Sequence, residues 1–384
     1  MEKSVLEPVV SKPAVSKTAP PRFRESSFSD YPQIATLESR YGLQTKTYEE
    51  WTHLWTQNPT YRQFSHWPIG WVCENEQNEI VGCVSNIPLA YGLDSRNLVA
   101  ATSRSLVVDT RYRCYAFSLL SRFFKQPNVD LFLNTTVNAP ASKLQEMFRA
   151  VRVPAGVWNR SAFWITNYRA FAASLLARKK LPAAKAVSYP LSAGLFVRDT
   201  LTGRAIRGPH NGIPVEFCTQ FDARFDRFWA SVRNSSPRRL LATRSREVLD
   251  WHFRHAIEAN RAWVLAISQG SELAAYGVFR RQDNPTLGLF RMRLVDFQTA
   301  PGRTELLKPI LHSALERCRH EGIHMLEAIG FCGEKQRLID SLAPYYRELT
   351  SWRYFYKTND WHLAARLEDP QTWDATCFDG DASL

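Results

Sequence analysis

The sequence lacks any cysteine pattern that would bind a metal or build a disulfide framework. Its seven cysteines are scattered and odd in number, and none forms a Cys-x-x-Cys pair. They are Cys73, Cys83, Cys114, Cys218, Cys318, Cys332 and Cys377. Scattered free thiols are typical of a reducing compartment. We therefore expect a cytoplasmic protein without a metal site, in which most cysteines are buried thiols.

Long apolar runs are also missing. No run of about 18 apolar residues predicts a transmembrane helix, and the N-terminus has no apolar segment of a secretory signal. Zinc-finger spacing, RNP-like aromatic motifs and a basic-zipper pattern, each typical of nucleic-acid binding, are absent. Positive charge is abundant, with a formal net charge of +12. This charge favours an anionic partner, although most of the lysines and arginines are expected to form a solvated surface.

Residues 97–138 contain the strongest local pattern. An apolar β-rich run over 98–108 precedes a basic turn over 111–116, an amphipathic helix over 117–124 and a second strand over 129–133. A helix N-terminus after a strand presents free backbone N–H groups and binds phosphates. Arg111 and Arg113 add guanidinium groups, which suit phosphate oxygens. The alternative is a generic βαβ unit whose arginines are merely solvated.

The turn resembles the pyrophosphate-binding motif of the GNAT acyltransferase superfamily, (Arg/Gln)-x-x-Gly-x-(Gly/Ala). Arg111 matches its first position, Ala116 its last, and Cys114 stands in place of its first Gly. The preceding strand end, 107–109, also matches. The resemblance implies an acyl-CoA cofactor, acetyl-CoA or another, and a backbone N–H of Val107 or Val108 that polarises the thioester carbonyl. The cofactor contacts that it implies come from Val107, Val108, Arg111, Tyr112, Arg113, Cys114, Tyr115, Ala116 and Asn138.

The resemblance continues in the next helix, where Asn138, Ala141 and Leu144 match the pattern Asn-x-x-Ala-x-x-Leu-Tyr. Gln145 occupies the position of the Tyr, which in that family is the usual general acid, and an amide cannot act as an acid. The catalytic residues stay unassigned, with Tyr112 and Tyr115 as the candidates. A covalent mechanism through Cys114 would need a neighbouring histidine, and none of the nine histidines can be assigned to it.

The order of expected elements in the second half repeats that of the first. This predicts an α/β (α+β) protein with two tandem GNAT-like domains, each a mixed, mainly antiparallel sheet flanked by helices. The expected segments are a disordered leader over 1–26, an N-terminal domain over 27–158, a connector helix and linker over 159–195, a C-terminal domain over 196–370 and an acidic tail over 371–384. Asp296 is expected at the end of the strand that corresponds to residues 98–108.

Four further segments carry expectations. Residues 159–180 read as a basic helix that connects the domains or touches a membrane surface, and 182–190 as a linker. Residues 197–215 read as short strands. The aromatic segment 51–55 reads as core, and the tail as a solvated acidic end. The segment 51–59 and the tail pattern Trp373, Thr376 and Asp379-Gly-Asp381 resemble acyltransferase-like proteins of bacterial polysaccharide gene clusters.

The function favoured by these patterns is transfer of an acyl group, acetyl first, from acyl-CoA to the amine of a small molecule. The resemblance suggests an amino sugar as acceptor. Two alternatives remain. The substitutions at Cys114 and Gln145 and the degenerate second turn favour a non-catalytic binding or scaffold protein. The net charge is compatible with a transferase that uses aminoacyl-tRNA and has the same architecture.

Overall fold

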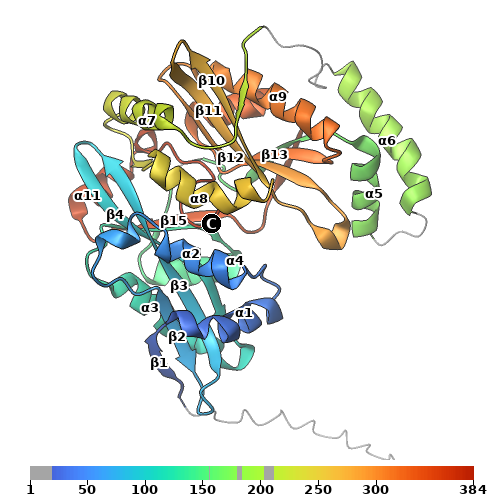
Figure 1. Ribbon diagram of the computed structural model, residues 1–384. Helices are drawn as coiled ribbons and strands as arrows, with labels where there is room; N and C mark the ends of the chain where they lie inside the picture. Colours follow the sequence, from blue (N-terminus) through green and yellow to red (C-terminus); the bar gives the residue numbers. More distant parts are fainter. Residues whose placement is uncertain (1–19, 155, 180–183, 203–211) are drawn as a thin grey trace, which may run out of the picture.

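The computed structural model describes residues 20–154, 156–179, 184–202 and 212–384, which build two mixed β-sheets with helices packed on them (Figure 1). One sheet and its helices, blue to cyan, form the lower half in this view, and the other half lies above it. None of the helices in the described ranges is long and apolar enough to cross a membrane. The expected fold class, an α/β protein with two mixed sheets flanked by helices, is confirmed.

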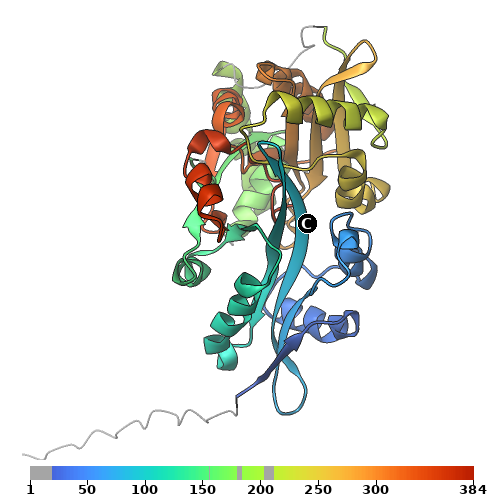
Figure 2. The same ribbon diagram turned by 90° about the vertical axis from the view of Figure 1, so that its left-hand side faces the viewer.

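The first sheet has the strand order β1-β2-β3-β4-β5-β15-β6, with β9 paired to the far end of β3. Its strands are β1 (Arg22–Glu25), β2 (Gly70–Glu74), β3 (Ile80–Leu93), β4 (Arg96–Val108), β5 (Leu131–Val137), β6 (Val151–Arg152), β9 (Leu241–Ala242) and β15 (Arg353–Lys357). Only β4 and β5 pair in parallel in this sheet, as far as the described residues show. The long β3–β4 hairpin rises from the lower half to the upper half (Figure 2).

The helices of this half are α1 (Tyr31–Arg40), α2 (Tyr48–Thr56), α3 (Ala116–Lys125) and α4 (Ala139–Met147). Thr47 and Glu50 form a reciprocal capping box that starts α2. The apolar stripe predicted for α3 is buried, with Leu119, Leu120 and Phe123 fully covered. Trp51 and Trp55 of α2 lie in the same core, as the sequence predicted.

The second sheet has the order β14-β7-β13-β12-β11-β10-β8, and here β12 and β13 are the parallel pair. Its strands are β7 (Arg160–Ile165), β8 (Glu216–Cys218), β10 (Ala262–Gln269), β11 (Glu272–Arg281), β12 (Arg291–Thr299), β13 (Met325–Ile329) and β14 (Tyr345–Glu348). The remaining helices are α5 (Tyr168–Arg178), α6 (Ala184–Leu201), α7 (Ala223–Ser235), α8 (Arg246–Glu258), α9 (Leu307–His320), α10 (Gly333–Leu342) and α11 (Trp361–Leu367).

The two halves exchange strands. Strand β7, from the middle of the chain, pairs with β13 and β14 of the second sheet, whereas the late strand β15 pairs with β5 of the first. The prediction of one helix over 159–180 is therefore wrong in its first part. The side chains of Ala162 and Trp164 are buried in the second core, and Asn167 caps a helix that starts only at Tyr168.

Three neighbouring expectations also change. Helix α6 covers much of the stretch expected to be a linker and the start of the stretch expected to be short strands, while residues 180–183 and 203–211 lie outside the described residues. Strand β12 continues past Asp296 to Thr299, so Asp296 does not end its strand. Of the expected leader, 1–19 lie outside the described residues, and 22–25 form the edge strand β1.

The tail is buried rather than solvated. Trp373, Cys377 and Phe378 belong to the core cluster shared by both halves. The carboxylates between these apolar residues meet cations, because Lys335 Nζ lies 3.0 Å from Asp374 and Arg244 Nη2 lies 3.4 Å from Asp379. The acidic composition that suggested a solvated end instead matches buried positive charges.

Helices α2 and α8 make a reciprocal contact between the halves. His53 Nε2 lies 2.8 Å from the carbonyl oxygen of Trp251, and Trp251 Nε1 donates to the carbonyl oxygen of His53 at 3.1 Å. Both helices precede the first long hairpin of their half, β2–β3 after α2 and β10–β11 after α8. Their contact is pseudo-symmetric and fixes the seam between the halves.

We predict that Arg244→Ala lowers the free energy of unfolding by about 3–5 kcal/mol, because it leaves two buried carboxylates without their cation. Urea denaturation followed by tryptophan fluorescence measures the loss. The matched control is Arg254→Ala, which removes an exposed pair with Asp250 inside α8 and should cost less than about 1 kcal/mol. Similar losses in the two variants would contradict this account of the tail.

Candidate functional site

The first sheet opens where β4 and β5 diverge. The parallel pairing runs from Ala100↔Leu131 to Thr102↔Leu133 and then stops, although both strands continue. Just beyond this point the register of β4 against β3 shifts, and Ser105 has a left-handed φ of 56°. A β-bulge of this kind bends its strand and leaves part of the ladder unpaired. The edge of β4 from Ser105 to Val108 therefore faces a gap between diverging strands.

On one face, Asn134 fills the start of this gap. Its Oδ1 accepts hydrogen bonds from the backbone N–H and the hydroxyl of Ser103, and its Nδ2 donates to Gln145 Oε1 at 3.0 Å. Gln145 is itself buried. Gln145, at the position of the tyrosine in the motif, thus positions Asn134 through a hydrogen bond. This role does not require proton transfer.

On the other face, the tail closes the gap. Asp381 Oδ1 accepts from the backbone N–H of Thr135 at 2.9 Å and from its hydroxyl at 2.6 Å. Gly380 has a left-handed φ of 65°, and a Cβ there would lie 2.6 Å from Thr135 Cγ2. Only glycine allows the chain to pass this close to β5. The Asp379-Gly-Asp381 segment therefore packs closely against β5 at this gap.

Past the bulge, β4 leads to the turn that the sequence singled out. Asp109 caps it, accepting from the backbone N–H of Arg111 at 3.1 Å, and lies 3.3 Å from the guanidinium of Arg40. Residues Thr110–Tyr115 form a 3₁₀ helix that continues into α3. The side chains of Arg111 and Arg113 are exposed at this helix start. The turn therefore presents two guanidinium groups and the positive end of α3 at the open edge of β4.

The other predicted residues lie around this turn. Val107 and Val108 pair with Cys83 and Gly82 of β3, which leaves their opposite edge toward the gap. Ala116 is the first residue of α3, and exposed Asn138 caps α4 by accepting from the N–H of Ala141.

Cys114 is exposed and has no left-handed φ, so this turn does not require glycine at its position. Tyr112 is buried in the core, and the ring of Tyr115 packs on Phe23 with centroids 6.0 Å apart. Both tyrosines therefore have packing roles in the turn.

The equivalent gap in the second half is filled. Strands β12 and β13 pair from Arg291↔Met325 to Leu294↔Ala328 and then separate around Asp296. Arg244 Nε lies 2.8 Å from Asp296 Oδ2, and Thr376 of the tail donates to Asp296 Oδ1 at 2.8 Å. Burial alone would raise the pKa of Asp296, but the charge and hydrogen bonds of Arg244 outweigh it and lower the pKa. This gap holds a neutralised network instead of an open strand edge.

A small polar cavity of about 80 Å³ lies at the seam between α2 and α8. It is lined by Lys46, Glu50, His53, Leu54, Trp251, His252, His255, Ala256, Ala259, Arg261, Arg280 and Leu384. The side chain of Lys46 is partly buried. This burial, together with the charges of Arg280 and Arg104, lowers the pKa of Lys46 to about 7. Arg104, whose charge acts on Lys46, lies beside the bulge of β4.

Two histidines of α8, His252 and His255, also line this cavity. Burial and the charge of Arg280 lower the pKa of His252 well below its usual value, so it is neutral near pH 7. His252 Nδ1 and His255 Nε2 are buried and have no hydrogen-bond partner among the described residues. The seam therefore brings together the amine of Lys46, with its lowered pKa, and the neutral imidazole of His252.

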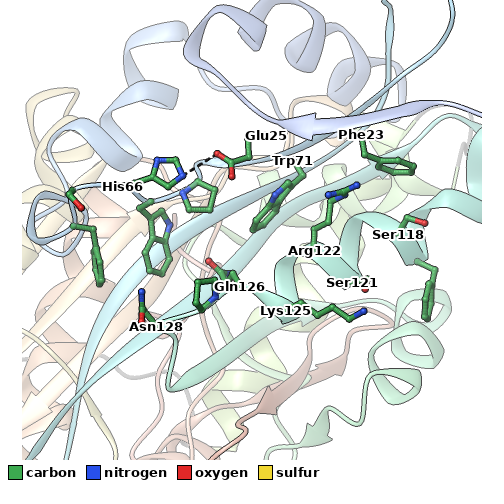
Figure 3. Close-up of a pocket in the computed structure, with 16 residues that line it drawn as sticks. Phe23, Glu25, His66, Trp71, Ser118, Ser121, Arg122, Lys125, Gln126 and Asn128 are labelled. Carbon is green, nitrogen blue, oxygen red and sulfur yellow. Dashed lines mark ion pairs between the residues drawn. The ribbon is translucent and has the colours of Figure 1, made fainter.

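A groove of about 870 Å³ lies elsewhere, between α3, the strands β1 and β2, and residues 64–68 (Figure 3). Arg122 and Lys125 of α3 face it, and His66 pairs with Glu25 at 3.3 Å across its rim. None of the residues predicted for the cofactor lines this groove. We therefore place the candidate site at the open edge of β4, where those residues converge.

Each half thus contains a bulged strand that diverges from its parallel neighbour and leads through a turn into a helix. No family model and no curated sequence matches the chain. Solved structures do share the fold. Saccharomyces cerevisiae N-myristoyltransferase with bound myristoyl-CoA is similar with a TM-score of 0.56 at 11% identity, over 93% of this chain and 85% of that one.

Two further structures are similar over both halves. A GCN5-related N-acetyltransferase from Anabaena variabilis has a TM-score of 0.52 at 10% identity, over 88% of this chain and 73% of that one. A putative acetyltransferase from Pyrococcus horikoshii has a TM-score of 0.51 at 10% identity, over 91% and 94%. The chain thus has the tandem-domain fold of the GNAT superfamily.

Sequence reasoning missed the groups that come together from distant segments. Lys46, His252 and Arg280 have no motif around them, and only the fold brings them to the seam. Ser103 and Asn134 were visible as polar residues at the ends of apolar runs, which is the one signal that marked the gap.

We predict that an aromatic disulfide reagent modifies Cys114 much faster than the other cysteines and that acyl-CoA slows this reaction. Cys114 is exposed, whereas burial raises the pKa of Cys73 to about 11 and that of Cys83 to about 12. The Cys114→Ser variant, which removes the fast thiol, is the control. A fast thiol whose rate does not respond to saturating acyl-CoA would place the cofactor away from this turn.

Proposed function

We propose that the protein transfers an acyl group from acyl-CoA to the amine of a small molecule. The observation that carries this proposal is the open edge of β4, which leads directly into a turn with two exposed guanidinium groups at the start of α3. The unpaired edge suits the amide groups of pantetheine, and the turn suits the pyrophosphate. Asn138, Cys114 and the backbone of Val107 and Val108 complete the proposed cofactor contacts.

The proposed reaction is direct transfer. The amine nitrogen attacks the thioester carbonyl carbon, forming a C–N bond while the C–S bond breaks and coenzyme A leaves as a thiolate. A backbone N–H at the edge of β4, from Val107 or Val108, polarises the carbonyl oxygen as negative charge develops on it. The nitrogen loses a proton to the protein, and the thiolate is protonated. A direct route requires no nucleophilic cysteine.

Proton acceptance is assigned to the seam. Lys46, with a pKa of about 7, and His252, neutral near pH 7, are the candidate bases at this seam. A base with a pKa near the working pH is the effective kind. The buried Tyr112 and the packed Tyr115 have no part in this scheme. We further propose that the acyl group is acetyl and that the acceptor is an amino sugar.

The first test is calorimetric titration with acetyl-CoA and with longer acyl-CoAs. Arg111→Ala and Arg113→Ala should each weaken binding by roughly tenfold or more, since each removes a charged hydrogen bond to phosphate. Arg227→Ala, an exposed arginine of α7 that pairs with Glu272, is the matched control and should bind like the wild type. No binding of any acyl-CoA would refute the proposed function.

We predict that Lys46→Met lowers kcat/KM for acyl transfer by roughly a hundredfold. In the wild type, kcat/KM should rise as the pH increases through about 7, because Lys46 accepts a proton only in its neutral form. This rising limb should disappear in the variant. Lys125→Met, on the far groove, is the control and should keep the wild-type profile. An unchanged pH profile in Lys46→Met would assign the proton to another group.

A further inference from the structure

Helices α5 and α6 form a hairpin at one edge of the second half, with α6 on its outer side (Figure 1). Asp199 attaches α6, because its carboxylate accepts hydrogen bonds from Tyr168 of α5 at 2.9 Å and from Tyr345 of β14 at 2.7 Å. In α5, the hydroxyl of Ser174 donates to the carbonyl oxygen of Gly288 at 3.1 Å. Both helices are therefore fixed to the second half, and the outer side of α6 is a surface of the protein.

This outer side of α6 is uncharged and largely apolar. It is formed by residues that follow one another at spacings of four, which places them along one side of the helix: Tyr189, Ala193, Val197 and Leu201. All are exposed, Val197 at 50% and Leu201 at 81%. The opposite side of the helix carries the buried Ser188 and Asp199. A patch of exposed apolar side chains marks a surface that contacts something outside the folded chain.

The charges around this apolar side have one sign. The sequence over 168–201 contains a single acidic residue, which is the buried Asp199. The hairpin exposes four basic side chains among the described residues, namely Arg169, Arg178, Lys179 and Arg198. Arg169 Cζ lies over the ring of Tyr189, 4.2 Å from its centroid, and so borders the apolar side directly. The described part of the hairpin thus presents apolar side chains and cations, without an exposed carboxylate.

We propose that the α5–α6 hairpin docks the protein on an anionic lipid membrane. The apolar side of α6 enters the boundary between headgroups and acyl chains, which is where a basic amphipathic helix lies. The exposed cations meet the negative headgroups, and each contributes roughly fivefold to the affinity. The ring of Tyr189 suits the headgroup level, because it has an apolar body and a polar tip. This docking is independent of the proposed acyl transfer.

A second copy of the chain fits the same surface less well. Two hairpins packed face to face would bring their cations together, and like charges at short range repel each other. An anionic bilayer instead offers an apolar layer to the outer side of α6 and negative charge to the cations beside it. The combination of the two features therefore favours lipid over self-association.

The docking is tested by sedimentation of the full-length protein with vesicles, in the absence of any acyl donor. One set of vesicles is phosphatidylcholine alone, and the other is equal parts of phosphatidylcholine and phosphatidylserine. The wild type should bind the anionic vesicles at least tenfold more tightly than the uncharged ones, and added sodium chloride should weaken this binding. Equal affinity for the two sets, or no binding to either, would overturn the proposal.

Two substitutions at exposed positions locate the contact. Leu201→Asp places a charge on the apolar side and Lys179→Glu reverses a cation, so each should weaken binding to the anionic vesicles by tenfold or more. The matched controls are Met147→Asp at the end of α4 and Lys308→Glu on α9, both exposed and outside the hairpin, and they should bind like the wild type. Thermal unfolding verifies that all four variants are folded. Wild-type affinity in either hairpin variant would overturn the proposal.

Self-association is tested on the protein alone by sedimentation equilibrium. The proposal predicts the same oligomeric state for the wild type and for Leu201→Asp, because lipid and not a second copy covers the apolar side. A wild-type dimer that Leu201→Asp dissociates would assign this side to self-association and would overturn the membrane proposal.

Discussion

The buried guanidinium of Arg244 is the interaction on which the arrangement of the two halves depends. It follows β9, which is paired to the first sheet, and it binds Asp296 of the second sheet and Asp379 of the tail. The ring of Phe378 covers it, with Cζ 4.7 Å from the ring centroid. Each of these charges would be costly to bury alone, whereas here the guanidinium of Arg244 pairs with both carboxylates and hydrogen-bonds to them. The tail therefore has one position, between the sheets.

This position of the tail makes the two halves unequal. In the second half, Arg244 and Thr376 occupy the gap where the parallel strands part, so no strand edge is free there. In the first half, Gly380 and Asp381 close one face of the gap near Thr135, and the edge of β4 beyond the bulge remains open. The duplicated fold thus has an open strand edge in its first copy and a filled gap in its second. The reciprocal contact of His53 and Trp251 joins the two copies beside the cleft.

Local patterns predicted the elements that build the cleft. The apolar spacing of 117–124 predicted α3, which begins one residue earlier, at Ala116, and the strand over 98–108 was predicted from its apolar run. The prediction failed where a partner far along the chain decides the structure. Residues 160–165 form a strand because β13 and β14 accept it on both sides, and no local feature showed this.

The tail and the seam were beyond prediction for the same reason. Asp379 reads as a solvated acid until Arg244, more than a hundred residues earlier, is placed beside it. Lys46 and Arg280 come from opposite halves of the sequence, and each alone is an ordinary surface cation. Burial lowers both pKa values first. The charge of Arg280 then adds to the shift of Lys46, and the charge of Arg261 adds to that of Arg280, which only the assembled fold provides. The turn was predictable because its residues are neighbours in the sequence. The polar seam was unpredictable, because its residues come from distant segments.

Whether the open strand edge in the first half holds acyl-CoA is tested by a crystal structure of the protein with a non-hydrolysable thioether analogue of acetyl-CoA. We expect density for one cofactor, with its pantetheine along β4 beyond Ser105 and its pyrophosphate at Arg111 and Arg113, and none between β12 and β13. A cofactor bound between β12 and β13, or in the groove beside α3, would contradict it.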